Sequence, residues 1–283
     1  MKSLGVTVLA AALAAFAPAV SVGQDLPPDQ HRQAVDFVIA NTRHVLYHEI
    51  GHMYVDLFDL PVLGKEEDAV DMLATLTLLE DQVREGSIAP LIDTADGWYY
   101  SERTRTYNYS DADFSGQHSL DIQRSFTITC LTVGSDFEAH TRFATRFGLS
   151  IDRQKTCEED YGLALSSWER VLAPYQRTRD VGADVAVRYV PTDQYQFISN
   201  ILRANRVLEN AAERVRKYYV LPAPVTFTAD TCGEINAFYI PDDREVVLCY
   251  EWADFYYSLF AEQVLPARLA LEESRRRKLE KIF

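Results

Sequence analysis

Residues 30–57 constrain the fold most strongly, because their apolar side chains recur at helical spacing around most of a helix circumference. Val38, Val45 and Val55 share one face with two histidines. The adjoining face carries Val35, Ile39, Leu46, Ile50, Met53 and Leu57. A helix that is apolar over so much of its surface is buried on several sides. The sequence therefore predicts a long helix inside the domain.

The same helix carries the motif HEIGH, in which His48 and His52 are four residues apart. Such residues project from one helix face about one turn apart, so both imidazoles can bind one Zn²⁺ ion at about 2.0–2.1 Å. Glu49 lies beside them, where it can act as a general base without binding the metal. The alternative is a pair of hydrogen-bonded core histidines. Gly51 favours the metal site, because it costs a helix roughly 1 kcal/mol and indicates close backbone packing.

A catalytic zinc site needs a third protein ligand, and the next predicted helix, residues 65–83, offers acidic candidates. Glu67 can bind the metal. Asp71, one turn later, can accept a hydrogen bond from the far nitrogen of a ligand histidine and fix its orientation. Glu66 competes with Glu67 as ligand, but Val70, four residues after Glu66, offers no such partner. Alone, this cluster would indicate only a first helical turn, where carboxylates favour the helix dipole.

The remaining pattern predicts an α+β domain that is predominantly helical, with a small β-sheet or hairpin late in the chain. Residues 95–116 are expected to be irregular or partly helical, and helices are expected over 118–134 and within 137–175. One long amphipathic helix is expected over 192–219, and a final helix from about Ala253. The segments ADVAVRYVP and APVTFTAD are expected to be strands, and INAFYIPDDREVVLCYEW a hairpin.

The N-terminus has the pattern of a secretory signal peptide, with Lys2, an apolar run from about Leu4 to Phe16 and then small residues. The run is too short to span a bilayer. We therefore expect a signal peptide over residues 1–23 and one exported domain over 24–283, without stable membrane insertion. The formal net charge of −14 argues against nucleic-acid binding. The basic cluster at the C-terminus, ESRRRKLEKIF, alternates with glutamates and is typical of a solvated helix end.

Four cysteines occur in the predicted mature chain, and an even number in an exported chain favours disulfides over free thiols. Three pairings are possible. The two nearest-neighbour pairs, Cys130–Cys157 and Cys232–Cys249, are the ones we expect. A four-cysteine metal site is the alternative, but the chain has no C-x-x-C pair to support it.

The stretches HEIGH and LPVLGKEEDAVD resemble the zincin metallopeptidases, specifically the gluzincins, whose third ligand is a glutamate in an E-x-x-x-D pattern. With HSLDIQR, the cysteine and GSD that follow it, and CGEINAFYIPDDREVVLCYEW, they resemble a family of exported bacterial metallopeptidases named from their motif. These stretches cover most of the mature chain, so the resemblance is to a whole domain. It implies a periplasmic or secreted protein with one Zn²⁺, the ligands His48, His52 and Glu67, the catalytic base Glu49, and Asp71 orienting a ligand histidine.

The position of one segment departs from the usual zincin order. Zincins place an edge strand beside the cleft, where an extended peptide can add as a further strand, and this strand normally precedes the H-E-x-x-H helix. Here Asn236, Ala237 and Phe238 begin the segment NAFYIP, which resembles the edge strand of CAAX-processing and stress peptidases but lies far downstream. We therefore expect a circularly permuted zincin whose sheet comes from residues 184–251. This hypothesis requires the segment to lie within about 15 Å of His48, the length of a short bound peptide.

His118 is a candidate for stabilising the oxyanion of acyl hydrolysis, as are Arg124 and Tyr239. The competing and simpler interpretation is that His118 and Asp121 cap a helix. The remaining histidines have no partner pattern and are expected to be structural or exposed: His31, His44 and His140.

These patterns together predict an exported zinc metallopeptidase that cleaves peptide or protein substrates with water activated by the metal and Glu49 as general base. One alternative is a non-catalytic zinc-binding or structural envelope protein, whose fourth coordination position would be closed by a protein ligand. Another is a zinc hydrolase of non-peptide substrates, because the motif specifies water activation and not the substrate.

Overall fold

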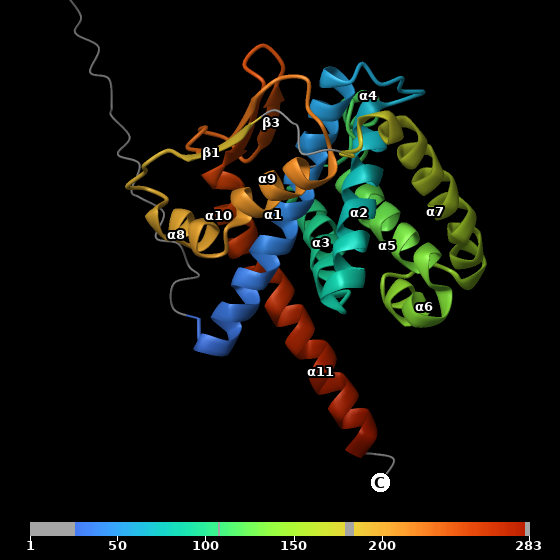
Figure 1. The fold of residues 1–283 in the computed structure, drawn as a ribbon. Helices are drawn as coiled ribbons and strands as arrows, with labels where there is room; N and C mark the ends of the chain where they lie inside the picture. Colours follow the sequence, from blue (N-terminus) through green and yellow to red (C-terminus); the bar gives the residue numbers. More distant parts are fainter. Residues whose placement is uncertain (1–25, 107, 179–183, 281–283) are drawn as a thin grey trace, which may run out of the picture.

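The computed structural model describes residues 26–106, 108–178 and 184–280, and the expected signal peptide lies outside these ranges. Figure 1 shows helices packed around the long helix α1 (Pro28–Leu57), with a small sheet beside its C-terminal end. The other α-helices of the described ranges are α2 (Glu66–Glu85), α3 (Ala89–Ser101), α4 (Asp111–Ser115), α5 (Asp121–Ser135), α6 (Phe137–Arg146), α7 (Ile151–Leu172), α8 (Gln196–Ala204), α9 (Val207–Tyr218), α10 (Tyr250–Leu259) and α11 (Leu265–Glu280). The strands are β1 (Val185–Tyr189), β2 (Val225–Asp230), β3 (Ala237–Ile240) and β4 (Glu245–Cys249). This arrangement confirms the predominantly helical α+β class.

The described strands form one sheet in the order β1-β2-β4-β3. β1 is parallel to β2, and β2 is parallel to β4. Parallel neighbours need a crossover connection, and α8 and α9 provide it between β1 and β2. β3 and β4 pair in antiparallel fashion as the expected hairpin. Because β3 pairs only with β4 in this sheet, it is an edge strand.

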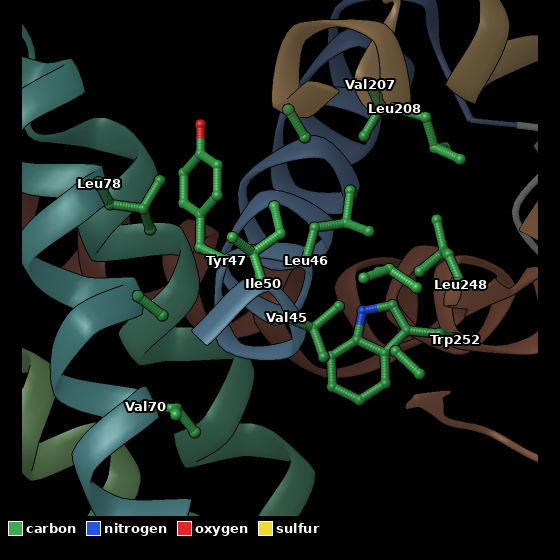
Figure 2. Close-up of a cluster of buried hydrophobic side chains, with 14 of the residues drawn as sticks. Val45, Leu46, Tyr47, Ile50, Val70, Leu78, Val207, Leu208, Leu248 and Trp252 are labelled. Carbon is green, nitrogen blue, oxygen red and sulfur yellow. The ribbon is translucent and has the colours of Figure 1, made fainter. Parts of the chain in front are cut away.

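The helix α1 is buried along most of its length, as its apolar circumference predicts. Phe37, Val38, Leu46 and Met53 are completely buried. Figure 2 shows side chains of α1 lying between α2 on one side and the β4–α10 region on the other. The labelled residues of this cluster are Val45, Leu46, Tyr47, Ile50, Val70, Leu78, Val207, Leu208, Leu248 and Trp252. One hydrophobic cluster therefore joins the early helices to the late sheet.

The expected long helix over residues 192–219 is wrong, because the structure breaks it into α8 and α9. Arg206, between them, has a φ of 52°, a left-handed conformation that does not continue a helix. The break lets each half bury its own apolar face, with Leu202 of α8 and Leu208 of α9 both completely buried. The last helical region also begins earlier than expected, at Tyr250.

Two disulfides, Cys130–Cys157 and Cys232–Cys249, are present in the structure and join nearest-neighbour cysteines. The first links α5 to α7. The second links the loop after β2 to the end of β4, beside the β3–β4 hairpin. Among the helices of the described ranges, none has both the length and the apolar character needed to cross a membrane.

Candidate metal centre

Close contact between α1 and α2 builds the site. A Cβ atom on Gly51 would lie 2.8 Å from Cβ and from Cγ1 of Val70, a distance that side chains do not tolerate. Glycine therefore lets α2 approach the turn of α1 that carries His48 and His52. The close packing that Gly51 indicates in the sequence is confirmed.

The structure brings His48, His52 and Glu67 together at this contact. The two Nε2 atoms of the histidines are 3.2 Å apart. Oε2 of Glu67 lies 3.1 Å from Nε2 of His48 and 3.3 Å from Nε2 of His52. A tetrahedral zinc ion with ligands at about 2.0–2.1 Å separates its ligand atoms by about 3.3–3.4 Å. The three atoms therefore have the spacing of three corners of such a site, and the residues fit a zinc ion.

Each histidine ring has a carboxylate at its far nitrogen. Nδ1 of His48 lies 2.7 Å from Oδ1 of Asp71, and Nδ1 of His52 lies 2.7 Å from Oε1 of Glu66. A proton on Nδ1, donated to the carboxylate, leaves Nε2 free for a metal. The contact of Asp71 is the one expected from the sequence. Glu66, the alternative candidate for the third ligand, instead contacts the far nitrogen of His52.

Hydrogen bonding and burial act in opposite directions on the ionisation of this cluster. Burial disfavours the charged form of His52, but hydrogen bonds with Glu67 and Glu66 outweigh it and raise the pKa of His52 to about 9. The same balance, with Asp71 and Glu67 as partners, raises the pKa of His48. Burial raises the pKa of Asp71, but Arg124 and His48 outweigh it and hold that pKa below its usual range. A metal ion would therefore displace protons from the histidines as it binds.

Glu49 faces the edge strand. The residue is 7% exposed, and burial raises the pKa of its carboxyl group above the usual range. A backbone hydrogen bond from the N–H of Tyr239 in β3 acts in the opposite direction and favours the carboxylate. The hydroxyl of Tyr239 donates to Oδ2 of Asp56 at 2.7 Å, which also holds the strand against α1. The segment NAFYIP therefore lies next to HEIGH, as the hypothesis of a permuted zincin requires.

The residues expected at the edge strand are found in and next to β3. Asn236 precedes the strand, and its carbonyl accepts a hydrogen bond from the N–H of Cys249. Ala237 and Phe238 lie within β3, paired with Leu248 and Val247 of β4. The other edge of β3 has no strand partner in the described part of the chain.

His118 lies over Glu67 on the exposed side of the cluster. Its Nε2 is 2.9 Å from Oε2 of Glu67, and its ring is stacked on that of His48 with centroids 6.2 Å apart. Its side chain is 58% exposed. The next residue, Ser119, fixes this segment to α2 by donating a hydrogen bond to Oδ1 of Asp68 at 2.6 Å.

The simpler interpretation of His118 and Asp121 as helix caps is wrong. The N-cap residue of α5 is Leu120, and its N–H donates to the side chain of Gln123. Asp121 instead accepts a hydrogen bond from Ser101 on α3. His118 lies outside α5 and contacts Glu67 because the chain crosses the start of α2 before α5 begins.

Two other expected oxyanion donors are already engaged. Arg124 is buried and binds Asp71, on the Nδ1 side of His48, so the expectation that it is a donor to substrate is wrong. The hydroxyl of Tyr239 is bonded to Asp56. His44 is also buried, with Nε2 3.3 Å from Oγ1 of Thr75, and burial lowers its pKa to about 3. Of the three expected donors, His118 is the one that lies beside the ligand triangle with most of its side chain exposed, although its Nε2 contacts Glu67.

A comparison with protein families finds one that covers most of the chain. A family model described as "Putative metallopeptidase" matches residues 16–172 and 189–282. The matched ranges include α1, α2, the segment that carries His118, and the β3–β4 hairpin. No curated protein and no solved structure matches the chain.

Proposed function

The chain belongs to the family described as "Putative metallopeptidase", and from this premise we propose that it is a zinc metallopeptidase that hydrolyses peptide bonds. The observation that carries the proposal is the triangle formed by Nε2 of His48, Nε2 of His52 and Oε2 of Glu67, with sides of 3.1 to 3.3 Å. These residues would hold one Zn²⁺ ion, which when bound polarises a carbonyl group and lowers the pKa of water.

Glu49 supplies the proton transfers. It takes a proton from the attacking water and passes it to the amine nitrogen that leaves the cleaved peptide. Two features support this role. Its position directly after His48 places its carboxyl group beside the ligand triangle, and its raised pKa makes it a better proton acceptor than an exposed glutamate.

The surroundings of the triangle supply substrate binding. An extended peptide adds to the edge of β3 that has no strand partner in the described sheet, through backbone groups other than the N–H of Tyr239, which bonds to Glu49. His118, on the exposed side of Glu67, donates a hydrogen bond to the oxygen that becomes negatively charged during attack. This arrangement supports a circularly permuted zincin in which the ligand helices precede the edge strand.

We further propose that the protein is exported and that residues 24–283 form one folded domain. The hydrophobic cluster that runs from Ala34 to Leu265 supports the single domain. The two disulfides support export, because such bonds persist in oxidising compartments.

The test measures the zinc content of the purified protein and its cleavage of a peptide library, with and without a chelator. We expect Glu49→Gln to keep zinc and lose about 10²–10⁴-fold in hydrolysis, because the general base is missing. His48→Ala should lose zinc as well as activity. Hydrolysis by the Glu49→Gln protein at the wild-type rate would contradict the mechanism.

One observation favours a second candidate, a non-catalytic zinc-binding protein. His118 is 2.9 Å from a ligand oxygen, close enough to close the fourth position of the metal as a ligand itself. His118→Ala separates the two candidates in the same assays. In a peptidase the variant keeps zinc and loses about 10²–10³-fold in kcat. If His118 is itself a metal ligand, the variant binds zinc more weakly than the wild type, and the wild-type protein does not cleave peptides.

A further inference from the structure

Arg124 on α5 is a buried arginine behind the ligand cluster, with 8% of its side chain exposed. Its Nε donates to Oδ2 of Asp71 at 2.7 Å, and its Nη2 donates to Oδ1 of Asp71 at 2.5 Å. Its guanidinium lies 3.6 Å from the ring centroid of Trp98, which is itself buried. The aromatic ring and the fork of hydrogen bonds thus hold the guanidinium on two sides.

Asp71 connects Arg124 to the proposed metal ligand His48 by short hydrogen bonds, and Nη2 of Arg124 also lies 3.4 Å from Nδ1 of His48. Oδ1 of Asp71 accepts from Nη2 of Arg124 and contacts Nδ1 of His48, and Oδ2 accepts from Nε of Arg124, so both oxygens are engaged. A two-bond fork fixes the plane of a carboxylate, which a single ammonium contact does not. The carboxylate in turn fixes the tautomer and the orientation of the imidazole. Trp98, Arg124, Asp71 and His48 therefore form one continuous chain of contacts from the core to the metal site.

The second histidine lacks this support. The carboxyl group of Glu66 bonds to His52, but its side chain is 43% exposed, and no lysine or arginine pairs with it in the described part of the chain. The two ligand histidines are thus held unequally. His48 has a buried carboxylate that is itself held by an arginine, whereas His52 has a partly exposed carboxylate that no arginine holds in the described part of the chain.

We propose that Arg124 is a positioning residue for His48, acting through Asp71, and that it raises the affinity of the site for zinc. It contacts neither the substrate nor the metal. The inference rests on the proposed function, because it assigns Arg124 a role toward the ion that His48 would bind. Alignment of the histidine by a held carboxylate is the physical basis of the expected effect.

The test measures zinc affinity by competition with a chromophoric chelator, and the absorption spectrum of the Co²⁺-loaded protein. The variants are Arg124→Met, Arg124→Lys and, as a matched control, Arg146→Met. Arg146 also forms a two-bond pair with a buried aspartate, Asp96, but has no contact with a proposed ligand. We expect Arg124→Met to bind zinc about 10–100-fold more weakly, with an altered Co²⁺ spectrum. Arg124→Lys should lie between Arg124→Met and wild type, and Arg146→Met should bind as the wild type does.

Circular dichroism of the metal-free proteins shows which variants fold. If Arg124→Met does not fold, Arg124→Lys carries the test, with weaker zinc binding and a changed Co²⁺ spectrum as the expected result. Wild-type affinity in a folded Arg124→Met protein, or in Arg124→Lys when Met does not fold, would overturn this inference alone. Failure of the wild-type protein to bind zinc would overturn the proposed function and this inference with it.

Discussion

At the scale of the residue, the contacts of each carboxylate in this site decide whether it is a proposed metal ligand or supports a ligand histidine. Glu66 and Glu67 are adjacent in the sequence, yet one contacts Nδ1 of His52 and the other contacts both Nε2 atoms. The reason is that consecutive helical residues point about 100° apart, so only one of them can face the centre of the cluster. Two residues of the same type therefore divide into a ligand and a support.

Asp71 is more buried than Glu66, so Asp71→Asn and Glu66→Gln are expected to weaken zinc binding by different amounts. Each variant removes one charge at nearly constant size. We expect Asp71→Asn to weaken zinc binding by about 10–100-fold, because a buried carboxylate aligns His48. Glu66→Gln should cost less, since water can replace much of an exposed contact. Isothermal titration with zinc measures both effects, and equal losses would count against the difference between the two histidines.

At the scale of the element, the pairing of α1 with α2 depends on a missing side chain. The motif residue Gly51 touches Val70, which is completely buried. Because α2 carries all three acidic residues that contact the histidines, the distance between these helices sets the geometry of the whole ligand triangle. Stability and metal binding are therefore coupled at this one position.

Gly51→Ala tests that coupling against Gly162→Ala. Alanine favours a helix over glycine by about 1 kcal/mol, but overpacking a core costs roughly 1–3 kcal/mol. Because the added Cβ would meet Cβ of Val70, which cannot swing away, we expect a net loss of up to about 2 kcal/mol. Gly162 in α7 has nothing within 4 Å of such a Cβ, so the same change there should stabilise the protein by up to about 1 kcal/mol. Urea unfolding measures both, and a stabilised Gly51→Ala protein would contradict the close packing.

At the scale of the whole molecule, partly buried ion pairs connect helices that are distant in the sequence. Arg268 on α11 binds Asp93 and Asp96 on α3, and Asp96 also binds Arg146 on α6. In Figure 1, α11 extends away from the other helices, and this network lies near its start. Its carboxyl groups are therefore expected to contribute to the dependence of stability on pH.

Burial outweighs the pairing of Asp93 with Arg268 and raises the pKa of Asp93 to about 6, from 3.8. The folded protein therefore binds a proton that the unfolded chain has released between about pH 4 and pH 6, so this group's contribution to stability falls as the pH rises through that window. Asp93→Asn removes the titration. We expect the free energy of unfolding of the wild type, relative to the variant, to fall by up to about 3 kcal/mol from pH 4 to pH 7. Parallel profiles in chemical denaturation would contradict it.

The sequence by itself determined the features that depend on residues three or four positions apart. The spacing of His48 and His52, and that of Glu67 and Asp71, places each pair on one helix face wherever that helix lies. Alternating apolar residues and turn residues likewise indicated the β3–β4 hairpin. Local geometry is sufficient for these predictions, because the helix and the strand each have a fixed period.

Only the tertiary structure decided how these elements face one another. The contacts of Glu66 with His52, of Arg124 with Asp71 and of His118 with Glu67 depend on the rotation of α2 and on where α5 packs. The break at Arg206 depends on the surfaces that α8 and α9 bury, although their combined pattern is that of one helix. The periodicity of apolar residues in the sequence indicates which face of a helix or strand is apolar. The packing of all the elements at once decides which polar side chains meet across that face, because each helix settles where the shared core is filled.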